Sequence, residues 1–359
     1  QGLLKKNKVK TFSGFGKIVR PGVVSVNDTD EIEAKNILLA TGSEARWFPG
    51  MEPDGKGIVT NREILDWTEL PKSLVVIGAG AVGTEFASLF HRFGVDTTLI
   101  EALPNITPLE DAEVSGELEK ILKKRGINVL TGAMVEAIKP GYEVVVSLGG
   151  KKQSIQAEKV LVAVGRKPNT EGIGLENTRA KAEKGFIDVN EYMETEEPGI
   201  YAIGDIVRTA ALAHVASAEG ILAVNRMAGR EVQPINHDRV PNVTYCDPQV
   251  ASVGLTEKAA RERGYDVHCG KFSYMGIGKA SIEGENEGFV KIIGEKKYNE
   301  VLGIHILHAH AGEMIAEGVA VLNGELTVEA LANSIHPHPT LSEAVGEATH
   351  AYFGHAIHI

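Results

Sequence analysis

Cysteine is scarce in this chain. The two cysteines, Cys246 and Cys269, lie 23 residues apart and form no Cys-x-x-Cys pattern. This spacing argues against a disulfide scaffold and against a cysteine-based metal site. Two free thiols are typical of a protein of the reducing cytosol. We therefore expect a cytoplasmic location, or the mitochondrial matrix if the source is a eukaryote.

Long apolar runs and basic blocks are also missing. No apolar run approaches the ~18 residues of a membrane span, and the formal net charge is −11. We therefore expect neither a membrane nor a nucleic acid as partner. No signal peptide opens the chain, and its first residue is Gln1 rather than Met. The start at Gln1, in polar sequence, leads us to expect a fragment or a processed form.

Glycine is abundant, with 40 glycines among 359 residues against a typical share of ~7%. Three of them, Gly78, Gly80 and Gly83, follow an apolar run with Gly-x-Gly-x-x-Gly spacing and precede a helix-like stretch, residues 84–93. This order is typical of a dinucleotide-binding βαβ unit, in which the first glycine permits the turn, the second admits a pyrophosphate and the third permits close packing. The alternative is a glycine-rich turn without a ligand.

An acidic residue, Glu101, ends the second apolar run, residues 97–100. It lies 23 residues beyond Gly78, about where a carboxylate accepts hydrogen bonds from a ribose 2′-hydroxyl. Because a 2′-phosphate would be repelled there, the sequence favours NAD over NADP.

Other segments predict further elements of an α/β chain. We expect strands at residues 9–15, 23–26, 37–40, 127–130, 160–164, 186–189 and 199–203, a hairpin region within 135–159, and helices at 111–125 and 211–228. From about residue 240 the pattern becomes that of an α+β module. Its strands are expected at 243–245, 250–253, 289–293 and 301–306, and its helices at 313–322 and 328–331.

Two polar groups stand where chemistry is expected. Asp205 follows an apolar strand and suits a sugar or ribityl hydroxyl, although a Gly-Asp pair after a strand is more often only a turn. His338 opens a helix five residues before Glu343, so a carboxylate can orient its imidazole as a base. A metal site at His305, His308 and His310 is disfavoured because these residues lie along a predicted strand, and we expect no metal.

Together these motifs resemble the flavoprotein disulfide reductases, and within them most closely the branch that oxidises dihydrolipoamide. The matching segments occur in family order at residues 40–43, 78–85, 101, 164–169, 201–205, 211–214 and 338–343.

The resemblance implies two cofactors, FAD and NAD. The residues implied for FAD are Gly16, Thr41, Gly42, Ser43, Asp205, Ala211, Leu212, Ala213 and His214. Those implied for NAD are Gly78, Gly80, Ala81, Val82, Gly83, Glu85, Glu101, Val135 and Gly165. His338 would be the acid–base partner of the reactive thiols, and Glu343 would orient it.

The same resemblance implies the domains and partners. Residues 1–70 and 169–239 would form a partial FAD-binding Rossmann-like domain, residues 71–168 the Rossmann-like NAD-binding domain, and residues 240–359 an α+β dimerisation domain. The partners would be a second copy of the chain in a homodimer and the lipoyl domains of 2-oxo acid dehydrogenase complexes.

The chain departs from the family in two places. It shows neither the first Gly-x-Gly-x-x-Gly, which binds the FAD pyrophosphate, nor the Cys-x-x-x-x-Cys redox pair. We therefore expect an incomplete form of such an enzyme. Two alternatives stay open: a non-catalytic NAD-binding module that self-associates, and a related flavin reductase that acts on another disulfide or a quinone.

Overall fold

The computed structural model describes residues 2–358 and divides into two compact units. Unit 1 comprises Gln1–Glu44 and Arg166–His237, and unit 2 comprises Ala45–Gly165 and Asp238–Ile359. Each unit is therefore built from segments that are distant in sequence. Residues 45–70, which the sequence grouped with residues 1–44, belong to unit 2, where β6 (Ile58–Val59) pairs with β13 (Lys159–Val162).

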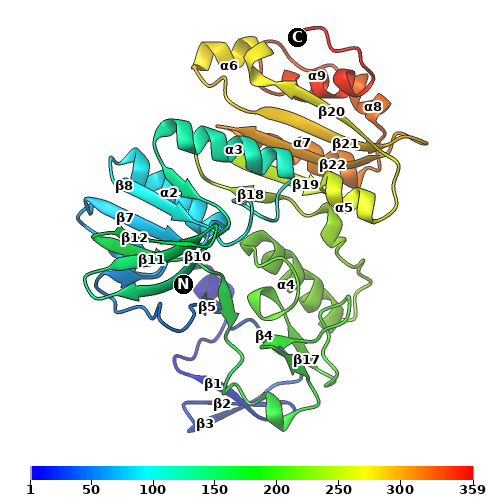
Figure 1. The fold of residues 1–359 in the computed structure, drawn as a ribbon. Helices are drawn as coiled ribbons and strands as arrows, with labels where there is room; N and C mark the ends of the chain where they lie inside the picture. The colour runs from blue at the N-terminus through cyan, green and yellow to red at the C-terminus, as the bar shows by residue number, and fades with distance from the viewer. Residues whose placement is uncertain (1, 359) are drawn as a thin grey trace. The chain divides into compact units, whose positions relative to one another are not determined.

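A five-stranded parallel sheet forms the first half of unit 2, called here the parallel-sheet half (Figure 1). Its strand order is β6-β13-β7-β8-β9, with β7 at Ser73–Ile77, β8 at Asp96–Ile100 and β9 at Asn128–Leu130. Helices α2 (Ala81–Arg92) and α3 (Ala112–Arg125) complete its βαβ units. The inner residues of β7, β8 and β13 are buried because helices and a second sheet cover both faces. That second, antiparallel sheet consists of β10 (Ala133–Lys139), β11 (Glu143–Leu148) and β12 (Lys151–Gln156).

A five-stranded antiparallel sheet forms the other half of unit 2, in the order β18-β19-β22-β21-β20. Its strands are β18 (Asn242–Thr244), β19 (Gln249–Gly254), β20 (Val267–Ser273), β21 (Phe289–Glu295) and β22 (Val301–His308). One face packs Val290, Ile292, Ile304 and Ile306 against helices α7 (Ala311–Asn323) and α9 (Glu343–Tyr352). The other face places Val250, Phe289 and Leu307 in the core of the parallel-sheet half. The central strands are thus buried on both sides.

Unit 1 is smaller and is built around a parallel pair, β4 (Ile37–Leu39) and β17 (Ile200–Ala202). A three-stranded antiparallel sheet precedes it, with β1 (Gly16–Arg20), β2 (Val23–Val26) and β3 (Asp30–Glu33). Helix α4 (Ala213–Met227) contributes Leu222 and Ala223 to a small core with Tyr201 and Ile203. The remaining elements are α1 (Gly2–Lys6), β5 (Ser43–Ala45), β14 (Arg166–Pro168), β15 (Ala182–Glu183), β16 (Phe186–Ile187), α5 (Glu257–Glu262), α6 (Gly278–Glu283), α8 (Val328–Ala332) and five short 3₁₀ turns.

One expected strand is wrong. Residues 9–15 form no strand, and Val9, Phe12 and Phe15 are exposed. Their apolar side chains have high strand propensity, but propensity yields where no neighbouring strand supplies hydrogen bonds. Within residues 2–358, no helix is long and apolar enough to cross a membrane.

Candidate active site and cofactor sites

The glycine turn of the parallel-sheet half connects β7 to α2. Gly78 adopts a φ of 98°, a conformation that costs a residue with a side chain. A Cβ on Gly83 would lie 1.8 Å from the Gly78 carbonyl oxygen, whereas a Cβ on Gly80 would meet nothing within 4 Å. The turn is therefore closed against the strand at Gly83 and open at Gly80, which is the shape that a pyrophosphate needs. Ala81 and Val82 lie in the first turn of α2. Its N-cap residue, Gly80, has no side chain that could accept a hydrogen bond from the N–H groups of this turn.

Glu101 lies at the end of β8 and closes the same turn from the other side. Its Oε2 accepts the Ala79 backbone N–H at 2.7 Å, and its Oε1 accepts that of Leu103 at 2.9 Å. The residue is buried. Each carboxylate oxygen has a second lone pair, so the group can still accept hydrogen bonds from ribose hydroxyls.

The other residues expected at NAD lie in different settings. Gly165 follows β13 with a φ of 114° and open space around its Cα. Val135 is buried in the core between the parallel sheet and β10–β12. Glu85 accepts the Tyr245 backbone N–H at 2.8 Å, and burial raises the pKa of its carboxyl group. Glu85 therefore connects α2 to the strand region at β18.

The residues expected at FAD gather within unit 1. Ser43 donates its hydroxyl to Asp205, and the Arg166 Nε donates to Ser43 Oγ at 2.6 Å. The Arg166 guanidinium also lies 3.4 Å from Asp205. Thr41 donates to the Asn169 carbonyl at 2.6 Å, and the Asn169 N–H donates to the Gly42 carbonyl. The Thr-Gly-Ser turn is thus held against the segment that begins at Arg166.

The remaining FAD residues lie at strand and helix ends. Ala211 and Leu212 precede α4, and Ala213 and His214 begin it; Leu212 is its N-cap and makes no side-chain capping bond. Gly16 is the first residue of β1. Sequence reasoning missed two supporting residues. Arg166 binds the Ser43–Asp205 pair; it lies in the matching segment at residues 164–169, but no role was expected for it. Glu219 accepts the Gly204 N–H at 2.7 Å from a fully buried position.

His338 and Glu343 form the expected pair. The His338 Nδ1 lies 2.9 Å from Glu343 Oε1, and the Thr340 N–H donates to Glu343 Oε2 at 2.8 Å. Burial raises the pKa of Glu343, but the Thr340 and His338 hydrogen bonds outweigh it, so the net pKa is lowered. Because the carboxylate accepts from Nδ1, the Nε2 nitrogen is left for a substrate proton. The His338 side chain is 77% exposed.

Neither cysteine suits thiol chemistry. Cys246 is buried, and desolvation raises its pKa to about 12. Burial and then the Glu257 carboxylate raise the pKa of Cys269 to about 12. Since the thiolate is the nucleophile, both side chains are inert near neutral pH.

A metal site at three further histidines was disfavoured, and two of these histidines bind backbone carbonyls. His305 Nε2 donates to the Leu255 carbonyl at 3.0 Å, and His308 Nε2 to the Glu285 carbonyl at 2.8 Å.

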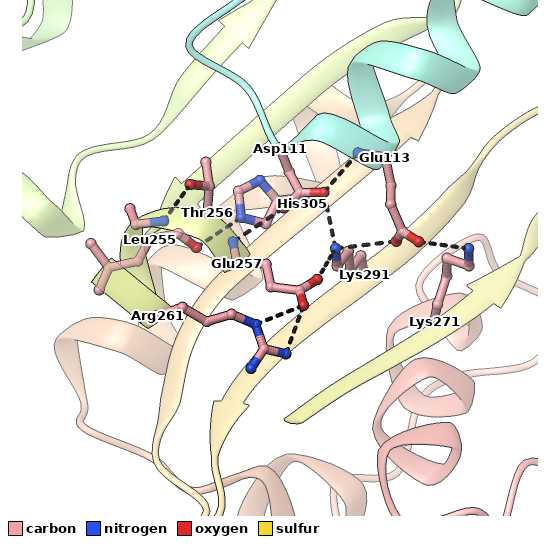
Figure 2. A network of polar contacts seen from close by, with 10 residues as sticks. Asp111, Glu113, Leu255, Thr256, Glu257, Arg261, Lys271, Lys291 and His305 are labelled. Atoms are coloured by element: carbon pink, nitrogen blue, oxygen red, sulfur yellow. Dashed lines mark hydrogen bonds and ion pairs between the residues drawn. The ribbon is translucent and has the colours of Figure 1, made fainter. Parts of the chain in front are cut away.

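An ion cluster around the buried Lys291 connects the two halves of unit 2 (Figure 2). Lys291 on β21 is 2% exposed and lies 3.0 Å from Asp111, 3.1 Å from Glu113 and 2.8 Å from Glu257. Asp111 is also the N-cap of α3 and accepts the Glu113 N–H. The cluster therefore attaches the first turn of α3 to the antiparallel sheet and to α5.

Comparison with known proteins gives the family. Residues 1–220 match the model of the pyridine nucleotide-disulphide oxidoreductases, and residues 240–349 match the dimerisation domain of the same family. The dihydrolipoyl dehydrogenase of Bacillus subtilis is 43% identical over 99% of this chain and 79% of its own length. That of Thermus scotoductus is 42% identical over 100% of this chain and 78% of its own.

Solved structures agree. LpdA of Mycobacterium tuberculosis superimposes with a TM-score of 0.87 at 27% identity, over 97% of this chain and 78% of its own. The HOCl-induced flavoprotein disulfide reductase RclA of Escherichia coli gives 0.84 at 25% identity, over 96% and 79%. The expected combination of Rossmann-like domains and an α+β dimerisation domain is confirmed as the fold class. Dihydrolipoyl dehydrogenases are oxidoreductases that depend on FAD and NAD, as expected. The chain therefore belongs to the pyridine nucleotide-disulphide oxidoreductase family and, within it, to the dihydrolipoyl dehydrogenases.

Proposed function

We propose that His338 is the acid–base residue of a dihydrolipoyl dehydrogenase reaction, in which dihydrolipoamide is oxidised to lipoamide and NAD+ is reduced. The observation that carries this proposal is the 2.9 Å contact of His338 Nδ1 with Glu343, on a side chain that is otherwise exposed. A base of this kind must present one free nitrogen and keep its ring oriented. Glu343 supplies the orientation, and Nε2 takes the proton of a substrate thiol so that the thiolate can react.

The NAD site would be the turn at Gly78, Gly80 and Gly83 with Ala81, Val82, Glu85, Glu101, Val135 and Gly165 around it. The residues present fit a dinucleotide. A side chain at Gly83 would clash with backbone, Gly80 is open, and the Glu101 carboxylate is fixed by two N–H groups. Glu101 would bind the ribose hydroxyls and exclude a 2′-phosphate by charge repulsion.

The FAD site would include Gly16, Thr41 to Ser43, Asp205 and residues 211–214. These residues fit part of the cofactor. The Asp205 carboxylate is fixed by Ser43 and Arg166 at the carboxyl end of β17, and it can accept a sugar or ribityl hydroxyl. Bound FAD supplies the redox chemistry between thiol and NAD; the residues of this chain hold and orient it.

The domains follow from these sites. Residues 71–168 would bind NAD, residues 1–70 with 169–239 would contribute to the FAD site, and residues 240–359 would form the contact between two copies of the chain. In such a homodimer His338 would serve the partner's thiols. The lipoyl domains of 2-oxo acid dehydrogenase complexes would deliver the substrate, in the cytoplasm of a bacterium or the mitochondrial matrix of a eukaryote.

The experiment replaces His338 by Gln in the flavin-loaded enzyme. Because general acid–base catalysis contributes about 10²–10⁴-fold, we expect dihydrolipoamide turnover to fall by about that factor. Flavin absorbance and NADH oxidation by ferricyanide should persist, since neither needs a base at the thiols. His310→Gln is the matched control, because His310 is also an exposed histidine beside a glutamate, with its Nε2 at 3.5 Å from Glu283. Near-normal turnover of His338→Gln would remove the proposed role.

The two thiols favour a second function for residues 1–359, namely NAD binding without catalysis. Both cysteines have a pKa raised to about 12, so neither can exchange with a disulfide at neutral pH. Purified residues 1–359 should then bind NAD without oxidising dihydrolipoamide. Oxidation of dihydrolipoamide by that polypeptide would contradict a non-catalytic role.

A further inference from the structure

A second histidine, His336, lies two residues before His338 and has the opposite environment. Its side chain is 11% exposed, and its Nε2 lies 2.8 Å from Glu317 Oε1 on α7. The neighbouring Ile335 is 99% exposed. His336 therefore points into the protein at the place where the chain approaches the proposed base.

The surroundings of His336 favour its charged form. The hydrogen bond to Glu317 raises the pKa of His336, burial opposes this shift, and a backbone hydrogen bond to Ser334 and the Glu343 charge also raise the pKa. Glu317 faces it from α7 and Glu343 from α9. Burial and then the Glu317 charge raise the pKa of the Tyr274 phenol, so this group stays neutral. A charge-assisted bond of this kind is stronger than a neutral one.

His336 anchors a segment that has little regular structure. Helix α8 ends at Ala332 and α9 begins at Glu343, and the residues between them form turns and irregular chain. At its end, Thr340 bonds to Glu343 and to the Pro337 carbonyl, contacts that are local in sequence. The His336–Glu317 bond instead reaches α7, 19 residues back along the chain. A Cβ on Gly346 of α9 would lie 3.0 Å from His336 Nδ1, so the ring is also packed against that helix.

We propose that His336 is a positioning residue for the dihydrolipoamide reaction: clamped between Glu317 of α7 and Gly346 of α9, it fixes the segment that presents His338. This inference rests on the proposed role of His338. Glu343 fixes the rotation of the imidazole ring about the side-chain bonds of His338. His336, in contrast, fixes the backbone from which that ring projects. Displacing a base by about 1 Å is enough to lower a rate by up to about 10²-fold.

The test compares three variants in the flavin-loaded enzyme. His336→Ala removes the bond to Glu317 and should lower kcat for dihydrolipoamide by about ten- to a hundredfold. His336→Gln should restore most of that loss because its amide N–H can still donate to Glu317. Glu317→Gln keeps an oxygen acceptor without the charge and should cause a smaller loss. His310→Gln, which removes a histidine–glutamate pair away from this segment, should leave kcat unchanged.

Two further measurements separate positioning from general damage. In His336→Ala, the rate of NADH oxidation by ferricyanide and the KM for NADH should be unchanged, because this reaction needs no base at the thiols. A loss of fold would instead lower this rate and dihydrolipoamide turnover together. The side-chain NMR resonances of His338 should shift in His336→Ala and not in His310→Gln. Unchanged kcat and unchanged His338 resonances in His336→Ala would overturn the inference. Unchanged turnover in His338→Gln would instead overturn the proposed function.

Discussion

The Glu101 carboxylate accepts the backbone N–H of Ala79 at 2.7 Å, across the glycine turn. The acid at the end of β8 is therefore part of the turn after β7 and does not merely lie beside it. The Ala79 carbonyl in turn accepts the Thr107 N–H at 2.7 Å. In the proposed NAD site, both the choice of cofactor and the shape of the glycine turn would thus depend on the Glu101 side chain.

Replacing Glu101 should change both properties, and two variants separate them. Glu101→Gln keeps an acceptor for the Ala79 N–H but removes the charge. We therefore expect weaker NAD binding and a smaller preference for NAD over NADP. Glu101→Arg should reduce the preference for NAD over NADP further, because a guanidinium attracts the 2′-phosphate of NADP. The dissociation constants of NADH and NADPH, from titration calorimetry, give the ratio. A ratio unchanged in both variants would refute the assignment of Glu101 to the ribose.

Gly83→Ala should damage the turn, because its Cβ would lie 1.8 Å from the Gly78 carbonyl oxygen. Overpacking of this kind costs about 1–3 kcal/mol, and the displaced backbone should bind NAD more weakly. Gly116→Ala in α3 is the matched control, since a Cβ there meets nothing within 4 Å. Alanine is favoured over glycine within a helix by roughly 0.5–1 kcal/mol, so this control should be slightly more stable. Urea unfolding and NADH titration measure both effects, and equal behaviour of the two variants would contradict the steric argument.

Local features of the fold and site could be predicted from the sequence. The glycine turn, Glu101 and the His338–Glu343 pair each depend on residues close in sequence or on one βαβ unit, whose geometry is nearly fixed. The α3 helix was expected at residues 111–125, and the structure has Ala112–Arg125 with Asp111 as N-cap. Periodicity and capping residues were sufficient for such elements.

Features that depend on distant contacts could not be predicted. Strand β20 was missed because Gly270 and polar residues interrupt its apolar pattern. Only tertiary packing explains that glycine, whose Cβ would lie 2.1 Å from the Ala348 carbonyl of α9. Arg166 reaches Ser43 across 123 residues of sequence. Lys291 lay unnoticed within an expected strand because its buried partner Asp111 is 180 residues away.

Lys291→Met should strongly destabilise unit 2. Removing one member of a buried ion pair costs about 3–5 kcal/mol because the other charge stays buried without compensation, and here Asp111 would be left at 4% exposure. Lys271→Met is the matched control, because Lys271 also contacts Glu113, at 3.4 Å, but is half exposed. Surface pairs contribute only about 0–1 kcal/mol. Urea unfolding of both variants tests this difference, and equal losses would contradict a special role for Lys291.

The same cluster should make stability sensitive to acid through Glu257. Hydrogen bonds from Lys291 and Arg261 lower its pKa from 4.5 to about 2, against the opposing effect of burial. A carboxyl whose pKa is depressed by folding stabilises the protein above its unfolded pKa, and this contribution is lost as pH falls through the folded pKa. The stability difference between the wild type and Glu257→Gln should therefore be constant above about pH 5 and shrink between about pH 4.5 and pH 2.

Urea unfolding at a series of pH values measures this difference. Glu262→Gln on the same helix is the control, since Glu262 is exposed and lies 3.8 Å from Lys258. Its difference from the wild type should stay small at every pH, because surface pairs are weak. A Glu257→Gln difference that stays constant down to pH 2 would show that the Glu257 carboxylate is not held by the cluster, and that Lys291 is compensated by Asp111 and Glu113 alone.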